Sequence, residues 1–219
     1  MNLSPNSQPQ VEASDFYGSR VPEQFNQTLA RQRQYAKNDP TAERVLAEME
    51  AVRASIVVEL HDGDRTSAQS AFAYDIDRGE MKLVESPAHI PFLVLAHSLA
   101  DFENLRRECG DSLLGFLGGL AGLGDEMRLT SQRVRSLREL SGSVVFDRIG
   151  DDGFALEASF GVTERASEPR ATIRLDEATY ARLRSGDLDA QDAFFAGEVE
   201  LVGDEGIAIE LALTALSPD

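Results

Sequence analysis

The 219-residue sequence has one cysteine, Cys109, and no tryptophan. A single cysteine excludes an internal disulfide and a cysteine-rich metal site. Positive charge is also scarce, because 21 lysine and arginine residues face 38 aspartate and glutamate residues, which gives a formal net charge of −17. Nucleic acid and anionic lipid surfaces repel a chain this acidic, so we expect no nucleic-acid partner.

Long hydrophobic runs are missing as well. No stretch approaches the roughly 18 consecutive apolar residues of a membrane-spanning helix, and the first residues lack the charged and apolar segments of a secretory leader. We therefore expect a soluble, cytoplasmic protein with no integral membrane segment. Zinc-protease, nucleophile-elbow, Walker and dinucleotide-binding motifs are absent. His89 and His97 have no cysteine or carboxylate at ligand spacing, so we expect no metal and no cofactor.

The first half of the chain predicts a tail, then helices and strands. Residues 1–40 are expected to be a flexible tail to about Arg20, rich in Asn, Ser, Gln and Pro, followed by one helix. A second helix is expected from Thr41. Strand patterns then follow at Ser55–Leu60, Ser70–Ile76 and Gly79–Glu85, with a further apolar segment at Pro91–Ala96 and a helix at Leu99–Arg107.

The second half gives clearer signals. A helix over 125–140 is expected to precede a hairpin of Ser143–Ile149 and Phe154–Phe160, joined by the turn residues 150–153. Asp176 is a good N-cap for a short helix that Gly186 ends. The remaining elements are strands at Ala171–Leu175 and Glu198–Val202, a short helix at Asp189–Ala196 and an apolar run at Ile207–Leu216.

The order of these last elements resembles the sterol carrier protein 2 family of lipid-binding domains. The resemblance covers about the last 90 residues, and its most specific part is the Ala-Phe-Phe-x-Gly segment. It implies a curved, mainly antiparallel sheet covered on one face by helices, with a lipid-sized tunnel between them. The matching residues are Leu175, Asp176, Tyr180, Leu183, Gly186, Ala193, Phe194, Phe195, Gly197, Val199, Leu201, Gly203, Gly206, Ile207 and Ile209.

The middle of the chain repeats part of this pattern. Phe102 and Leu105 correspond to Tyr180 and Leu183, and the Gly-Asp-Glu sequence at 124–126 recurs at 203–205. The segment 119–123 is too rich in glycine to be predicted as a strand with the same assurance as 198–202. We therefore predict an α+β protein of two sterol-carrier-like units, a degenerate one at 41–128 and a lipid-binding one at 129–219.

The candidate site is an apolar pocket in the second unit. Two alternatives stay open: the same residues pack as a solid core in an interaction protein, with a protein partner or a homodimer, or an isomerase or cyclase uses Tyr180 or Glu157 as acid or base. We rank the enzyme last, because no pair of ionisable groups with perturbed pKa values can be named. We expect non-catalytic binding or transfer of a fatty acyl chain, sterol or polyketide-like lipid. The lining is predicted to be Phe154, Leu156, Ile173, Tyr180, Leu183, Phe194, Phe195, Val199, Leu201, Ile207 and Leu211.

Overall fold

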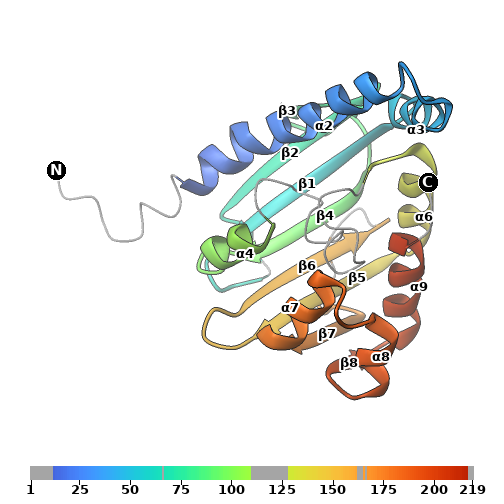
Figure 1. The fold of residues 1–219 in the computed structure, drawn as a ribbon. Helices are drawn as coiled ribbons and strands as arrows, with labels where there is room; N and C mark the ends of the chain where they lie inside the picture. Colours follow the sequence, from blue (N-terminus) through green and yellow to red (C-terminus); the bar gives the residue numbers. More distant parts are fainter. Residues whose placement is uncertain (1–11, 66, 110–127, 162–164, 166, 217–219) are drawn as a thin grey trace.

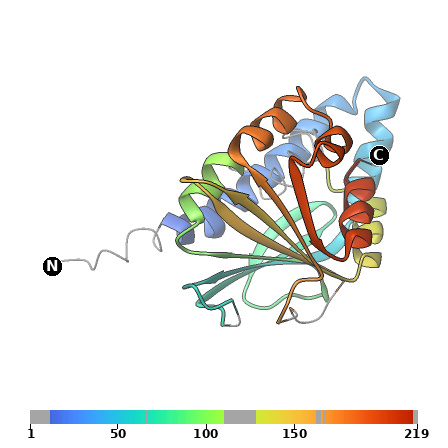
Figure 2. The ribbon, with the colours of Figure 1, turned by 90° about the horizontal axis from the view of Figure 1, so that it is seen from below.

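The computed structural model describes residues 12–65, 67–109, 128–161, 165 and 167–216. This part of the chain has an α+β fold, in which one twisted sheet of eight strands carries its helices on one face (Figures 1 and 2). The strands lie in the order β3-β2-β1-β4-β6-β5-β7-β8. Their bounds are β1 Arg53–His61, β2 Ser70–Asp77, β3 Glu80–Val84, β4 Pro91–Ser98, β5 Gly142–Ile149, β6 Phe154–Phe160, β7 Ala171–Asp176 and β8 Val199–Gly203.

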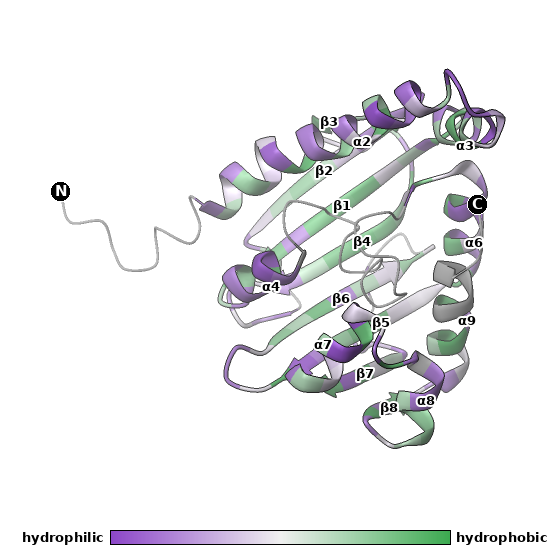
Figure 3. Ribbon diagram, viewed as in Figure 1, coloured by the Kyte–Doolittle hydropathy of each residue, from purple (hydrophilic) through white to green (hydrophobic). Residues whose placement is uncertain are grey.

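The helices pack against the sheet in several places. Helix α2 runs along the edge strand β3, whereas α7 and α8 lie over the second half of the sheet, and α6 and α9 lie near each other at one end (Figure 1). Figure 3 shows hydrophobic residues concentrated on the strands and many hydrophilic ones on α2. The bounds are η1 Phe16–Arg20 (a π-helical turn), α2 Val21–Tyr35, α3 Pro40–Glu50, α4 Phe102–Cys109, α6 Ser131–Glu139, α7 Glu177–Ser185, α8 Ala190–Phe195 and α9 Glu205–Leu216.

The same strand pairing occurs in both halves. Strand β1 pairs antiparallel with β2 and parallel with β4, and β5 pairs antiparallel with β6 and parallel with β7. The halves are joined where β4 pairs antiparallel with β6, over Leu93–His97 and Leu156–Phe160. The strands of both predicted units therefore form one continuous sheet.

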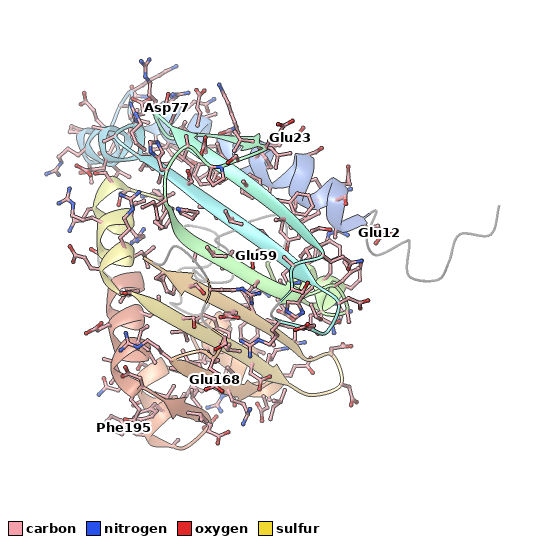
Figure 4. All side chains as sticks on the ribbon, turned by 180° about the vertical axis from the view of Figure 1, so that it is seen from behind. Glu12, Glu23, Glu59, Asp77, Glu168 and Phe195 are labelled. Atoms are coloured by element: carbon pink, nitrogen blue, oxygen red, sulfur yellow. The ribbon has the colours of Figure 1, made fainter. Side chains whose placement is uncertain are left out.

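Alternation along each strand separates an inner face, under the helices, from an outer face. On β6 the inner residues Phe154, Leu156 and Phe160 belong to the main core, whereas Ala155 is exposed. The outer face carries both charged and apolar residues: Arg165 pairs there with Glu59, and Val94 and Val145 are buried on the same side (Figure 4). One hydrophobic cluster runs beneath the helices from Ala13 to Leu211, so the two halves share a core.

The N-terminal prediction is wrong from Glu12 onward. Residues 12–20 are helical rather than a loose tail, and Phe16 and Tyr17 are buried in the main core. The sequence hid this because two aromatic residues among polar neighbours give no helical periodicity, yet rings of this size bury a large apolar area. The rest of the predicted tail, residues 1–11, lies outside the described residues.

Capping residues determine where helices α7 and α6 begin and where α7 ends. The Asp176 carboxylate accepts a hydrogen bond from the Thr179 N–H, and Gly186 ends α7 with φ of 77°, so both predicted caps are confirmed. The predicted helix over 125–140 is too long within the described chain. Helix α6 begins at Ser131 because Thr130 is its N-cap and accepts a hydrogen bond from the Arg133 N–H. Residues 125–127 lie outside the described residues, as does the weak strand at 119–123.

Candidate functional site

The predicted apolar lining forms one buried wall beneath α7 and α9, with two exceptions. Six of its members belong to the main core, and Ile173 and Val199 are partly buried against it. Leu201 is also partly buried and pairs with Ile173 across β7 and β8. The six core members are Phe154, Leu156, Tyr180, Leu183, Ile207 and Leu211.

Phe194 and Phe195 lie outside this wall. Phe195 is 75% exposed and Phe194 is 38% exposed, whereas the preceding Ala193 is fully buried. Successive residues of a helix are rotated by about 100°, so a short helix that turns Ala193 to the core directs its next two residues elsewhere. Figure 4 shows Phe195 at the periphery of the molecule. These aromatic rings make an exposed pair with centroids 5.8 Å apart.

A charged pocket adjoins the apolar wall. It has a volume of about 360 Å³, at the small end of the range for ligand sites. Its charged members come from α4, β5 and α7, and Tyr180 belongs to both the pocket and the core. The lining residues are Glu108, Arg148, Glu177, Tyr180, Ala181, Arg184 and Ser185.

Arg148 dominates the electrostatics of this pocket. It follows Val144 and Phe146 at inward positions of β5, and its side chain is only 3% exposed. The guanidinium lies over the ring of Phe154, 5.0 Å from the centroid, and near that of Tyr180 at 6.0 Å. A buried arginine needs an anion beside it, since leaving the charge unpaired costs several kcal/mol.

Glu108 supplies that anion. One of its carboxylate oxygens accepts a hydrogen bond from Arg148 Nη1 at 2.8 Å, and the other accepts one from Arg184 Nη1 at 2.8 Å. Arg148 Nη2 donates to the carbonyl of Asp152. The third group, Arg148 Nε, is buried and has no hydrogen-bond partner among the described residues. The Nε–H donor of this buried guanidinium is therefore unused.

The proposed acid or base Glu157 does not face the apolar wall. It lies between the inward residues Leu156 and Ala158 and points to the outer face of the sheet. There its carboxylate accepts hydrogen bonds from Arg65 and Arg165, both at 2.8 Å. Tyr180 is on the inner side, so of the two alternative residues considered for an enzyme only Tyr180 lies at the apolar wall, and Glu157 is wrong as its acid or base.

The buried histidine of β4 serves the N-terminal helix. His97 Nδ1 lies 2.7 Å from the Ser98 carbonyl, which fixes that nitrogen as a donor, so the Tyr17 hydroxyl donates to Nε2 at 2.6 Å. Burial lowers the pKa of His97 to about 4, against the opposing effect of the Ser98 hydrogen bond. His97 is thus neutral and links Tyr17 to the sheet.

Metal-ligating groups are dispersed over the described residues. No cluster of three or more His, Cys, Asp or Glu side chains is placed to hold a metal ion there. Over the same ranges, none of the helices has the length and apolar character needed to cross a membrane.

Comparison with known proteins gives one family match. Residues 134–214 match the model of the SCP-2 sterol transfer family, which confirms the resemblance predicted for the second half. The matched segment contains most of α6, the hairpin β5–β6, and every element through most of α9. No curated protein matches the chain.

Three solved structures have weak similarity to the chain. Sterol Carrier Protein 2 Like 2 from Aedes aegypti is 21% identical over 33% of this chain and 72% of its own, with a TM-score of 0.27. Sterol Carrier Protein 2 from Yarrowia lipolytica is 18% identical over 40% of this chain and 79% of its own, with a TM-score of 0.28. A conserved hypothetical protein from Thermus thermophilus is 13% identical over 99% of this chain and 89% of its own, with a TM-score of 0.18. Such low TM-scores do not bear on the function.

Sequence reasoning missed the charged pocket. A signal was present, because the inward positions of β5 run Val144, Phe146, Arg148, and a charged residue in an inward series requires a partner. The partner Glu108 comes from α4 in the other half of the chain, 40 residues earlier. No local pattern relates those two positions.

Proposed function

We propose that the second half of the chain binds and carries a hydrophobic small molecule, such as a fatty acyl chain, a sterol or a polyketide-like lipid, without catalysing a reaction. One observation carries the proposal: the segment that matches the SCP-2 sterol transfer family also supplies the buried apolar wall under α7 and α9. Removing apolar area from water contributes about 25 cal/mol per Å², so burying a few hundred Å² of ligand gives useful affinity.

The least enclosed part of the wall indicates where a ligand would enter. Ile173, Val199 and Leu201 are only partly buried, and they lie on β7 and β8 at one edge of the described sheet. Ile207 and Leu211 of α9, by contrast, are almost fully buried. A ligand reaching the wall from the β8 edge displaces fewer packed side chains than one entering through the middle of the sheet.

Two neighbouring residues of β8 make a matched pair for the test. Leu201 faces inward and is partly buried, whereas Val202 faces outward and is 47% exposed. Titration with a fluorescent fatty acid and a fluorescent sterol should saturate at one ligand per chain. Leu201→Gln should weaken binding about tenfold or more, because it places a polar group against the ligand, and Val202→Gln should leave it unchanged. Saturation at two ligands, no binding of either probe, or equal effects of the two variants would contradict the proposal.

An interaction protein remains the second candidate, and the β8 edge favours it. Phe195 and Ile209 are exposed near this edge strand, which in the described sheet has a neighbour on one side only. Edge strands offer unpaired backbone groups to another strand. The partner that fits is a second copy of the chain pairing β8 with β8. A concentration series in light scattering tests it: a dimer supports this candidate and a monomer at all concentrations opposes it.

A further inference from the structure

The charged pocket combines two features that the carrier proposal does not yet use. Its guanidinium, Arg148, is 3% exposed and is paired with Glu108. Tyr180 lines the pocket and packs edge-to-face on Phe154, with ring centroids 6.5 Å apart, and both rings belong to the main core. The charged pocket and the apolar wall therefore meet at Tyr180.

We propose that this pocket binds the anionic head group of an amphipathic lipid, with a carboxylate as the simplest case, and that the head group takes the place of the Glu108 carboxylate between Arg148 and Arg184. This inference rests on the proposed carrier function and names the class of its ligand. The lipid chain then lies along the wall beyond Phe154 and Tyr180.

The exchange replaces one carboxylate by another. Arg148 is too deeply buried to lose its anion without a large cost, but an incoming carboxylate can accept the same two hydrogen bonds that Glu108 now accepts. Glu108 is better placed to leave than Arg148, because its side chain is 16% exposed and that of Arg148 is 3% exposed. It also lies next to the last residue of α4, so moving it requires no change in the sheet.

The ligand's advantage over Glu108 is its chain. The Glu108 carboxylate bridges Nη1 of Arg148 and Nη1 of Arg184. A head-group carboxylate in the same position accepts the same two charge-assisted hydrogen bonds, and the burial of its apolar chain adds a favourable contribution that the Glu108 side chain lacks. A neutral alcohol or sterol hydroxyl gains no ionic bond, and it leaves Glu108 in place.

A matched pair of probes and a matched pair of variants test the exchange. Oleate and oleyl alcohol share a chain and differ in head group, and both are titrated into the full chain by calorimetry from cyclodextrin. Glu108 and Glu177 both line the pocket, but only Glu108 is bonded to Arg148 and Arg184. Glu108→Gln removes the competing carboxylate and should raise oleate affinity about tenfold, the size of one charge-assisted hydrogen bond. Glu177→Gln makes the same change of charge and should alter it less than about threefold.

Replacing either arginine should lower the affinity for oleate, the opposite of the effect expected for Glu108→Gln. Arg148→Gln should lower oleate affinity about tenfold or more and leave oleyl alcohol unchanged. Arg184 is 47% exposed, so Arg184→Gln retains the fold and serves if the Arg148 variant does not fold. It should weaken oleate about threefold or more without affecting the alcohol.

The outcomes separate this inference from the carrier function. If oleyl alcohol and oleate bind equally, and Glu108→Gln and Glu177→Gln have the same effect, the carrier function stands and the head-group site is wrong. If neither compound binds, the carrier function itself fails. Butyrate has the head group without the chain, and binding as tight as that of oleate would mean a small-anion site and would overturn the lipid assignment.

Discussion

Residue by residue, burial separates the aromatic side chains that hold the fold from those that do not. Phe195→Ala should change the free energy of unfolding by no more than about 0.5 kcal/mol, because the ring is 75% exposed. Leu137→Ala is the control: Leu137 is 1% exposed in the main core, so its loss should cost about 2–5 kcal/mol. Chemical denaturation measures both, and a similar loss in the two variants would contradict the placement of α8.

His97 makes the stability depend on pH. Its pKa is about 4 in the folded protein, mainly because it is buried, against an ordinary value of about 6.5 when unfolded. The unfolded chain therefore binds the proton more readily below pH 6.5. Stability should fall as the pH drops from 6.5 toward 4, by up to about 1.4 kcal/mol for each pH unit.

The variant His97→Gln isolates this contribution, since glutamine accepts a hydrogen bond from Tyr17 but does not titrate. Nearby Asp101 and His61 also act on His97, and they remain in both proteins. The free energy of unfolding is measured against pH for both proteins. The difference between the two curves should therefore change with pH between pH 4 and 6.5 and stay constant outside that range. Parallel curves over that range would show that His97 is not buried and neutral.

The side of an element on which a side chain lies could be predicted where hydrophobic and polar residues alternate regularly. The same prediction failed where they do not. The inward series on β6, Phe154, Leu156 and Phe160, follows from strict alternation. Hydrophobicity alone predicts that Phe194 and Phe195 face inward, but a six-residue helix has room for one inward residue in that turn, and Ala193 occupies it. Arg148 is the opposite case: charged residues usually face solvent, but this one occupies an inward position of β5.

At the scale of secondary structure, the positions of strands and helix caps could be predicted from the sequence. The pairing of one strand with another from a distant part of the chain could not. The hairpin of β5 and β6 follows from two alternating segments around Gly150 and Gly153. The pairing of β4 with β6 joins segments from different halves, and local patterns carry no information about it. The helix before β5 was predicted too long because its Thr130 N-cap lies inside an otherwise continuous polar and apolar pattern.

The division into units at residues 128 and 129 stays a prediction, and the sheet gives it a specific consequence. A fragment of residues 129–219 keeps β5 to β8 but leaves β6 without β4, with an inner face that the first half no longer completes. It should unfold less cooperatively than the full chain, or aggregate through the open β6 edge. Thermal melts followed by circular dichroism compare the two. A fragment as stable and cooperative as the full chain would show that the second half is independent.

At the scale of the molecule, the described residues form one sheet with a shared core beneath its helices. Its net charge of −17 opposes adsorption to anionic membranes, so lipid uptake should depend on brief contact and on the apolar wall rather than on charge attraction. The two halves of the chain contribute different residues to this region. The second supplies the wall, and the first supplies Glu108 at the charged pocket beside it.

Native mass spectrometry of the full chain tests the carrier function most directly. The protein is purified without detergent and sprayed under non-denaturing conditions, before and after incubation with a mixture of fatty acids and sterols. The account predicts the mass of the chain plus one lipid, lost when the protein is denatured and diminished in Leu201→Gln but not in Val202→Gln. The bare mass in every spectrum, with no lipid retained from the mixture, would contradict it.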